Sequence, residues 1–343
     1  MLKIVKTTAY SDMKMGTAGL RKKSKIVLQE NYLENFVQSV FNAIGGVEGL
    51  TFILGGDGRF YNKVAIQKII KMAAANGMKK IIVGQNGFIS TPASSHVLLM
   101  NKADGGFVLS ASHNPGGVNG DFGIKYAVAS GGQCPTSISD KIYEISKTIN
   151  EYKILDAEDV DLSRLGVQKL DNLEIEVIDP VKDYVDMMEH IFDFSSIKKL
   201  FENGFTMVFD AMNAVTGPYA RKIFEEILGA PKGSVINYVP LEDFGGLHPD
   251  PNLIYAKSLV DLMYSDKAPD FGAANDGDGD RNMILGKKFF VTPSDSLAIL
   301  TDNYKLIPAY KNGIYGVAKS AATSTAVGRV AEALKIGYYE VPT

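Results

Sequence analysis

The sequence of 343 residues holds a single cysteine, Cys134, so it cannot form an intrachain disulfide. A secreted scaffold that depends on disulfides is therefore excluded. No apolar run approaches the ~20 residues that a membrane-spanning helix needs. The first 16 residues include three lysines and have no continuous apolar core, so we expect no signal peptide. These absences predict a soluble cytoplasmic protein with no membrane span.

Charge of one sign is also scarce, because 39 acidic residues nearly balance 36 basic ones and leave a net charge of −3. Proteins that bind nucleic acid or anionic membranes usually carry a basic excess, so we expect neither partner. The 34 glycines and 13 prolines are ordinary for a folded chain, which excludes the disordered and low-complexity classes. At ~150 residues per domain, the length predicts two to three domains.

The first half alternates between apolar runs and amphipathic segments. The spacing predicts strands over 51–54, 80–83 and 107–110, and helices over 31–44, 63–76 and 91–100. Asn31 is a candidate cap for the first helix, with Glu34 three residues further on. This alternation predicts an α/β fold with a mostly parallel sheet and helices on both faces.

The second half repeats the pattern of strand, polar turn and helix. We expect an edge strand over 173–178, a helix starting at Asp179-Pro180, strands over 206–209, 313–317 and 338–341, and helices over 218–228 and 324–334. We therefore predict successive similar α/β domains over 1–188, 189–301 and 302–343. The last piece is too short to be stable alone, so we expect it to pack on the second or to be an incomplete domain.

A polar, glycine-rich segment directly follows the strand predicted over 107–110. It runs from Ser110 through Ser112, His113 and Gly117, and Lys125 lies shortly downstream. Ligands of open α/β sheets bind beyond the carboxyl ends of strands, and a serine near a histidine and a lysine can act as a nucleophile. Composition alone favours a simple tight turn at this point. The glycine-rich segment 55–59 also follows a strand, and we interpret it as a structural turn facing the same cleft.

A second motif, 275–281, places the carboxylates of Asp276, Asp278 and Asp280 on alternate residues and Arg281 beside them. Such dense carboxylates repel one another unless a cation lies among them. A calcium loop would need glycine at the position of Arg281 and glutamate at that of Lys287, so this alternative fails. A dehalogenase-type aspartyl nucleophile fits poorly, and a solvated acidic turn stays possible. Three carboxylates suit Mg²⁺, which keeps waters or a phosphate oxygen in its coordination shell.

The two motifs suggest one site, in which Ser112 carries a phosphoryl group and the metal of the acidic motif binds it. Four segments in this order resemble the α-D-phosphohexomutases, closest to the eukaryotic-type phosphoglucomutase branch that includes parafusin. They are Thr17-Ala18-Gly19-Leu20-Arg21-Lys22, the Ser112 motif, His248-Pro249-Asp250-Pro251-Asn252 and the Asp276–Arg281 motif.

The resemblance implies that Ser112 is a phosphoserine, and that glucose 1-phosphate and glucose 6-phosphate interconvert through glucose 1,6-bisphosphate. It implies Mg²⁺ held by Ser112, Asp276, Asp278 and Asp280, and hexose phosphates as the small-molecule partners. Arg21 and Arg281 would bind phosphate and stabilise charge, and His113 and Lys125 match positions of proton transfer or phosphate contact. Asp280 and Thr343 would contact the substrate.

Family members are longer and have four domains, whereas this sequence ends within the third. The family's Gly-Glu-x-Ser sugar loop and its fourth domain, which hold the end of the sugar that does not react, are absent from it. Loss of that remote binding energy would lower transition-state stabilisation. The expected function is therefore a Mg²⁺-dependent phosphoglucomutase, an intramolecular phosphotransferase. The alternative is a truncated or parafusin-like phosphoprotein that binds sugar phosphate or a partner without turnover.

Overall fold

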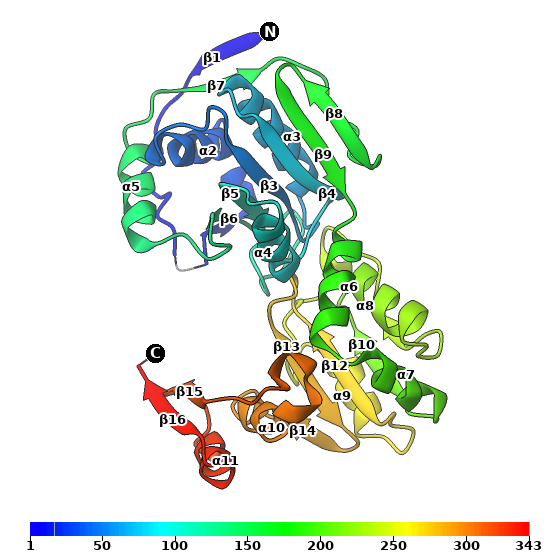
Figure 1. Cartoon of the computed structure of the whole chain (residues 1–343). Helices are drawn as coiled ribbons and strands as arrows, with labels where there is room; N and C mark the ends of the chain where they lie inside the picture. The colour runs from blue at the N-terminus through cyan, green and yellow to red at the C-terminus, as the bar shows by residue number, and fades with distance from the viewer. Residues whose placement is uncertain (17, 343) are drawn as a thin grey trace.

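A seven-stranded mixed sheet forms the centre of the first unit in this computed structural model, which describes residues 1–16 and 18–342 (Figure 1). In spatial order the strands are β2 (Leu20–Lys23), β6 (Asp121–Val128), β5 (Gly105–Leu109), β3 (Thr51–Gly56), β4 (Lys80–Phe88), β9 (Leu173–Ile178) and β8 (Gly166–Leu170). Strands β5, β3, β4 and β9 run parallel, and the outer strands are antiparallel to their neighbours. This arrangement confirms the predicted α/β fold, but the sheet is mixed rather than mostly parallel, because three of its six strand pairs are antiparallel.

Helices cover both faces of this sheet because successive residues of each strand point to opposite sides. Phe52 and Leu54 enter one apolar core, and Ile53 between them enters the other. The helices of this unit are α1 (Ser24–Val27), α2 (Tyr32–Ala43), α3 (Asn62–Ala75), α4 (Thr91–Met100) and α5 (Thr136–Ser146). The short strands β1 (Leu2–Lys6) and β7 (Glu151–Leu155) pair separately beside α3.

A second sheet organises the next unit, with the order β11-β10-β12-β13-β14. Its strands are β11 (Val235–Ile236), β10 (Met207–Asp210), β12 (Phe271–Asn275), β13 (Asn282–Gly286) and β14 (Phe289–Val291). Its helices are α6 (Pro180–Ile191), α7 (Phe194–Glu202), α8 (Thr216–Ala220), the π-helix η1 (Arg221–Ile227), the 3₁₀ turn η2 (Phe244–Gly246) and α9 (Lys257–Met263). Residue 188, the boundary proposed from the sequence, falls inside α6.

The last segment adds two parallel strands to a pair of helices, below the first unit in Figure 1. Its elements are α10 (Ser296–Asp302), the 3₁₀ turns η3 (Tyr304–Leu306) and η4 (Pro308–Tyr310), β15 (Gly316–Ser320), α11 (Ala326–Leu334) and β16 (Gly337–Val341). Helix α11 contacts α10, and the 3₁₀ turn η4 contacts α6. The last segment therefore packs on the second unit.

Several local predictions differ from the structure. The strand 173–178 is not at an edge, because β8 pairs outside it. Asn31 begins α2 without a side-chain cap: its φ of 59° is left-handed, and its Oδ1 accepts a hydrogen bond from the Tyr152 hydroxyl at 2.9 Å. The strand predicted over 313–317 lies three residues later, at β15. The helix predicted over 218–228 starts at Thr216 and continues as a π-helix.

Among the described residues, no helix combines the length and the apolarity that crossing a membrane requires.

Replacing Phe107 by alanine should destabilise the first unit by about 3–5 kcal/mol, because its ring is buried in the core against Phe41, Phe52 and Tyr126. Urea denaturation followed by circular dichroism measures the change. The control, Val167→Ala on β8, removes an exposed side chain and should stay within about 0.5 kcal/mol of the wild type. Equal effects of the two substitutions would contradict this account of the core.

Candidate active site

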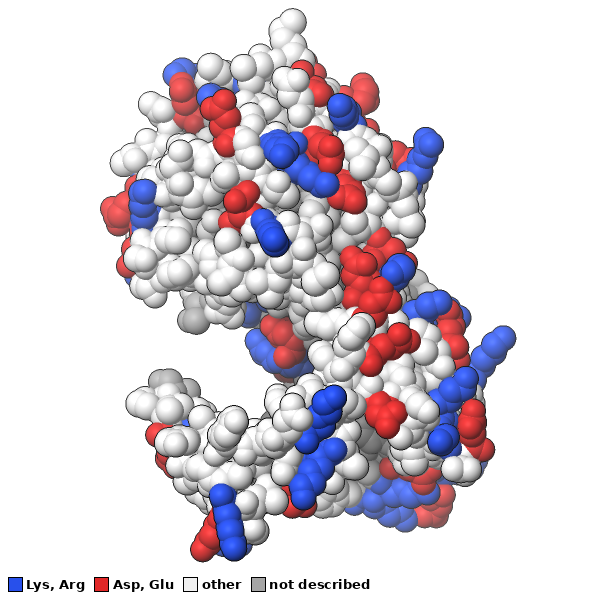
Figure 2. Space-filling view, in the orientation of Figure 1, with Lys and Arg blue, Asp and Glu red and all other residues white. Residues whose placement is uncertain are grey.

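Loops from the carboxyl ends of strands in both sheets meet at one place. In the first sheet, the segment 110–120 follows β5, the segment 57–61 follows β3, and β4 leads to the start of α4. Since these strands are parallel, their carboxyl ends share one edge of the sheet. In the second sheet, the acidic loop 276–281 follows β12. Figure 2 shows a hollow between the first unit and the others, with basic and acidic side chains together at its inner end.

Ser112 lies in the loop after β5 in an unusual backbone conformation. Its φ is 54°, a left-handed value that residues other than glycine and asparagine seldom adopt. The residue is fully buried. The Ser110 hydroxyl accepts a hydrogen bond from the Ser112 N–H at 2.7 Å. Such a conformation persists only when its surroundings hold it, and it concentrates at functional sites.

Arg59 is one of the groups that hold this loop, and the sequence analysis assigned its segment only a structural turn. Its Nη2 donates to the carbonyl of Ser112 at 2.7 Å, and its Nη1 donates to that of Asp121 at 2.9 Å. Asp57 balances its charge, with Nε–Oδ2 and Nη2–Oδ2 distances of 2.9 and 2.8 Å, and both side chains are fully buried. The turn after β3 therefore positions the serine loop.

The acidic loop curls around the carboxylate of Asp276. The Asp276 Oδ1 accepts hydrogen bonds from the N–H groups of Gly279 at 3.1 Å and Arg281 at 3.2 Å. Gly277 lies against the serine loop, because a Cβ at that position would come within 2.5 Å of the Ser112 carbonyl oxygen. Only glycine permits so close an approach of the two backbones.

Two contacts join the acidic loop to the first unit. The Ser112 hydroxyl donates to Asp276 Oδ2 at 2.8 Å, across 164 residues of sequence. Thr91, at the start of α4, donates from its N–H to the Asp278 carbonyl at 2.9 Å and from its hydroxyl to Asp278 Oδ2 at 2.6 Å. The two motifs singled out in the sequence thus form one cluster.

The three aspartates place one oxygen each within 4.8 Å of one another. Burial, followed by repulsion from Asp278 and Asp280, raises the pKa of Asp276 to about 7. Burial opposes ionisation of Asp278 as well, but the neighbouring Lys125 and Thr91 hold its pKa below the usual value. The cluster is therefore a concentrated negative charge that a cation would stabilise.

Basic side chains surround the carboxylates. Lys125 on β6 lies 2.5 Å from Asp278 Oδ2, and Arg281 lies 3.7 Å from Asp280. Arg21 on β2 has a buried Nε with no hydrogen-bond partner among the described residues, and burial together with the nearby Arg281 lowers its pKa. A buried arginine N–H without a partner suits a bound anion such as a phosphate.

His113 faces the second unit through one aromatic contact and one polar contact. Its Nδ1 is 2.6 Å from Arg281 Nη1, and its ring stacks on that of His248, with centroids 6.3 Å apart. Burial and the neighbouring Arg281 lower the pKa of His113, which favours the neutral ring. His248 in turn packs on Tyr255 at 4.1 Å. His248, which belongs to one of the four motifs of the family resemblance, borders this cluster in the structure.

The cluster brings together eight of the side chains predicted from the sequence. They are Arg21, Ser112, His113, Lys125, Asp276, Asp278, Asp280 and Arg281. Thr343 and Thr17 lie outside the described residues. Thr91 belongs to the same cluster and was missed. Ser110, Asp57 and Arg59 also belong to it. They lie in segments that were predicted as the serine motif and as a turn facing the same cleft, but no role in the site was predicted for them. The charged pair within the glycine-rich turn 55–59 was a signal that could have indicated Asp57 and Arg59.

The donor set fits a hard divalent cation. It comprises three carboxylates with the Ser112 hydroxyl beside them, and Asp278 Oδ1 is buried with no hydrogen-bond partner among the described residues. Oxygen ligands of this kind suit Mg²⁺, whose coordination shell is usually completed by water or phosphate oxygens.

Two family models match most of the chain. The family model described as "Phosphoglucomutase/phosphomannomutase, alpha/beta/alpha domain I" matches residues 12–153, and that for domain II matches residues 182–288. The chain belongs to the phosphoglucomutase/phosphomannomutase family. Both loops of the cluster lie inside the matched ranges of this family.

Relatives within the family are similar over the whole chain. The phosphoglucomutase of Rhizobium radiobacter is 59% identical over 343 residues, which are 100% of this chain and 63% of the relative. The cytoplasmic phosphoglucomutase of Populus tremula is 52% identical to this chain. The aligned region covers 99% of this chain and 62% of that relative. The chain thus spans less than two thirds of these family members.

A solved structure in the family has the same fold. The open form of the exocytosis-sensitive phosphoprotein pp63/parafusin (phosphoglucomutase) of Paramecium superposes with a TM-score of 0.95 at 46% identity. The match covers 100% of this chain and 64% of that one. A phosphomannomutase described as putative, from Thermus thermophilus, shares the fold with a TM-score of 0.72 at 21% identity.

Replacing Arg59 by methionine should destabilise the protein by about 3–5 kcal/mol, because it leaves Asp57 as a buried carboxylate without a counter-charge. Thermal and urea denaturation measure the loss. The double variant Asp57→Leu/Arg59→Met removes both charges and should be more stable than the single variant. Arg329→Met, at an exposed site on α11, is the control. A single variant as stable as this control would contradict the assigned role.

Proposed function

We propose that this chain carries out the phosphoryl transfer of a phosphoglucomutase, with Ser112 as the group that carries the phosphoryl. The substrates would be glucose 1-phosphate and glucose 6-phosphate, with glucose 1,6-bisphosphate as the intermediate. The names of the relatives support the reaction, and the resemblance of the four sequence motifs supports the substrates.

One observation carries the proposal: the Ser112 hydroxyl, held in a left-handed conformation, contacts Asp276 at 2.8 Å. A serine that carries a phosphoryl group at this position would bring its oxygens beside the cation site of the acidic loop. Arg21, Arg281 and Lys125 would then face the phosphate with positive charge. Phosphoryl transfer depends mainly on this kind of positioning and charge stabilisation.

The proposed reaction consists of two phosphoryl transfers. A sugar hydroxyl attacks the phosphorus on Ser112, so that a bond from phosphorus to the sugar oxygen forms and the bond from phosphorus to Oγ breaks. The hydroxyl proton passes to a side chain of the site, for which His113 and Lys125 are the candidates. That side chain returns the proton to Ser112 Oγ. The bisphosphate then reorients in the site, Ser112 Oγ gives its proton to the same side chain and attacks the other phosphoryl group, and the sugar oxygen takes up this proton as the second sugar monophosphate leaves.

The acidic loop would hold Mg²⁺ through Asp276, Asp278 and Asp280. When bound, Mg²⁺ supplies positive charge that stabilises the transferring phosphoryl oxygens. The chain's own part is to orient the carboxylates, which the N–H groups of Gly279 and Arg281 and the hydroxyl of Thr91 do by hydrogen bonding. The basic side chains of Arg21 and Arg281 would bind the phosphates of the substrate, with Asp280 beside them.

This chain matches only 63% of the length of its Rhizobium relative. Catalytic turnover and phosphorylation of Ser112 without turnover are therefore tested separately. A coupled assay for glucose 6-phosphate, with glucose 1-phosphate and a trace of the bisphosphate, distinguishes them. Steady formation of glucose 6-phosphate supports the mutase. Uptake of a phosphoryl group without it supports the phosphoprotein alternative.

The cytoplasm is the inferred location, and both cytoplasmic and chloroplastic phosphoglucomutases are among the relatives.

Ser112→Ala should abolish phosphoryl uptake, because it removes the only oxygen that we assign to carry the group. Intact-mass measurement before and after incubation with glucose 1,6-bisphosphate detects the added phosphoryl group. Ser139→Ala on α5 is the matched control and should take up one group per chain, as the wild type does. Full uptake by Ser112→Ala, or none by the wild type, would refute the assignment.

Asp278→Asn should weaken Mg²⁺ binding by more than about tenfold, because a neutral amide replaces a charged carboxylate. The Oδ1 of that buried carboxylate has no hydrogen-bond partner among the described residues and is available to a cation. Isothermal titration with MgCl₂ measures the dissociation constant. Asp266→Asn changes an exposed aspartate that pairs with Lys288 away from the site, and it should leave the constant unchanged. An unchanged constant in Asp278→Asn would contradict the proposed ligand set.

A further inference from the structure

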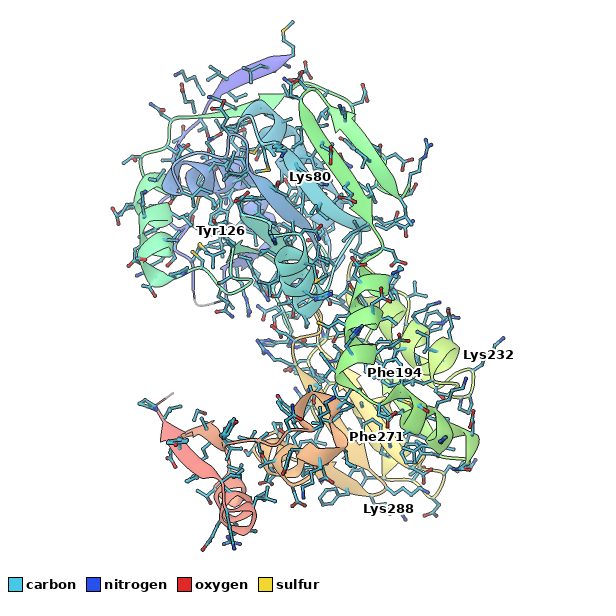
Figure 3. The ribbon with its side chains drawn as sticks, viewed as in Figure 1. Lys80, Tyr126, Phe194, Lys232, Phe271 and Lys288 are labelled. Atoms are coloured by element: carbon cyan, nitrogen blue, oxygen red, sulfur yellow. The ribbon has the colours of Figure 1, made fainter. Side chains whose placement is uncertain are left out.

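One of the four motifs of the family resemblance, His248-Pro249-Asp250-Pro251-Asn252, has no part in the function proposed above. It lies between the 3₁₀ turn η2 and helix α9, outside the strands of the second sheet. In Figure 3, β12 runs from the labelled Phe271 towards the first unit, and the acidic loop follows its end. The motif meets the serine loop beside this acidic loop, because the ring of His248 stacks on that of His113, which also contacts Arg281.

The motif forms a turn that its own hydrogen bonds stabilise. The Asn252 Oδ1 accepts hydrogen bonds from the N–H groups of Ile254 at 2.9 Å and Tyr255 at 3.0 Å. The Asn252 Nδ2 donates to Asp250 Oδ2 at 2.9 Å, and the Asp250 N–H donates to the His248 carbonyl at 2.8 Å. An asparagine that bonds to backbone groups further along the chain stabilises a turn. The turn therefore holds the rings of His248 and Tyr255 next to each other.

The ring of His248 packs between two other rings of different origin. Its centroid lies 4.1 Å from that of Tyr255 and 6.3 Å from that of His113, and the planes of the two histidine rings are within 4° of parallel. Parallel aromatic rings at such a distance attract each other when they are offset. The His248 Nε2 is buried and has no hydrogen-bond partner among the described residues. A hydrogen bond from Nε2 therefore does not explain a histidine at this position, whereas the face of its ring contacts His113.

Two contacts orient the His113 ring. Arg281 Nη1 donates to His113 Nδ1 at 2.6 Å, because an arginine can only donate. The ring turns about its Cβ–Cγ bond, and the energy of this torsion has broad minima. The Arg281 side chain is 46% exposed and can follow Nδ1 as the ring turns, so the hydrogen bond alone does not fix the ring. The stack on His248 limits the turn, because rotation would lose the parallel contact.

The orientation of this ring determines where its second nitrogen lies. Since Arg281 occupies Nδ1, Nε2 is the ring nitrogen that remains for a phosphoryl oxygen or a sugar hydroxyl. A group that moves or holds a proton must come within ~2.6–3.2 Å of the atom that it serves. A misplacement of ~1 Å caused by a substitution outside the reacting groups can lower a rate about a hundredfold.

We propose that His248 is a positioning residue for His113. Its ring, packed on Tyr255, sets the plane of the His113 ring and therefore the place of Nε2 beside the phosphoryl group on Ser112. His248 acts through His113 and not on the substrate itself. This role rests on the proposed function, because it concerns the rate at which the phosphoryl group moves to and from Ser112.

Timed intact-mass measurement of phosphoryl uptake from glucose 1,6-bisphosphate tests the role on the whole chain. His248→Leu keeps an apolar side chain of similar size but removes the flat ring, so it should lower the maximum rate of uptake at least about tenfold. The half-saturating concentration of the bisphosphate should change little, because positioning of His113 acts in the transition state. The final extent should stay at one group per chain, since Ser112 itself is unchanged.

A variant that restores the ring separates positioning from a general loss of structure. His248→Phe keeps a flat ring and gives up a buried nitrogen that has no partner, so its maximum rate should return close to that of the wild type. The matched control, His190→Leu, makes the same substitution as His248→Leu at an exposed position on α6. It should react as the wild type does.

The outcomes distinguish this role from the proposed function. Equal rates of His248→Leu and the wild type, or a His248→Phe variant as slow as His248→Leu, would overturn the positioning role and leave the phosphoryl transfer intact. A lower final extent in His248→Leu would also overturn it, because the substitution would then have damaged the site as a whole. Absence of uptake by the wild type would refute the proposed function, and this role with it.

Discussion

The contact between a serine loop and an acidic loop, which belong to different sheets, is the feature on which the rest of the site depends. Ser112 reaches Asp276 only because both backbones come together at Gly277, where any side chain would collide with the Ser112 carbonyl. Thr91 adds a second connection through Asp278. Each loop is strained or charged by itself, and each is stabilised where the other meets it. Residues of both units therefore form one site, although each unit has its own apolar core.

Much of this arrangement could be predicted from local patterns. Apolar periodicity located β3, α3 and α4 to within a few residues, and the dense aspartates of 276–280 indicated a cation site. Parallel strands also explained why loops far apart in sequence share one edge. These features depend on neighbouring residues, which is why sequence alone reveals them.

Other features depend on distant residues and could not be predicted. The burial of Arg59 requires the carbonyl groups of Ser112, in the loop that follows β5, and of Asp121, at the start of β6, both more than 50 residues later. β8 is short and mostly exposed, so its residues lack the alternation that reveals a half-buried strand, and β9 was mistaken for an edge as a result. The Oδ1 of Asn31, expected to cap α2, instead accepts a hydrogen bond from Tyr152, 121 residues later.

The most direct test of the central claim is a crystal structure of the phosphorylated chain grown with Mn²⁺ in place of Mg²⁺. Anomalous scattering locates the ion without reference to the chemistry assigned to it. The account predicts one strong peak between Asp276, Asp278 and Asp280, within coordinating distance of a phosphate oxygen on Ser112. A peak elsewhere, or a phosphorylated Ser112 separated from the three aspartates, would contradict it.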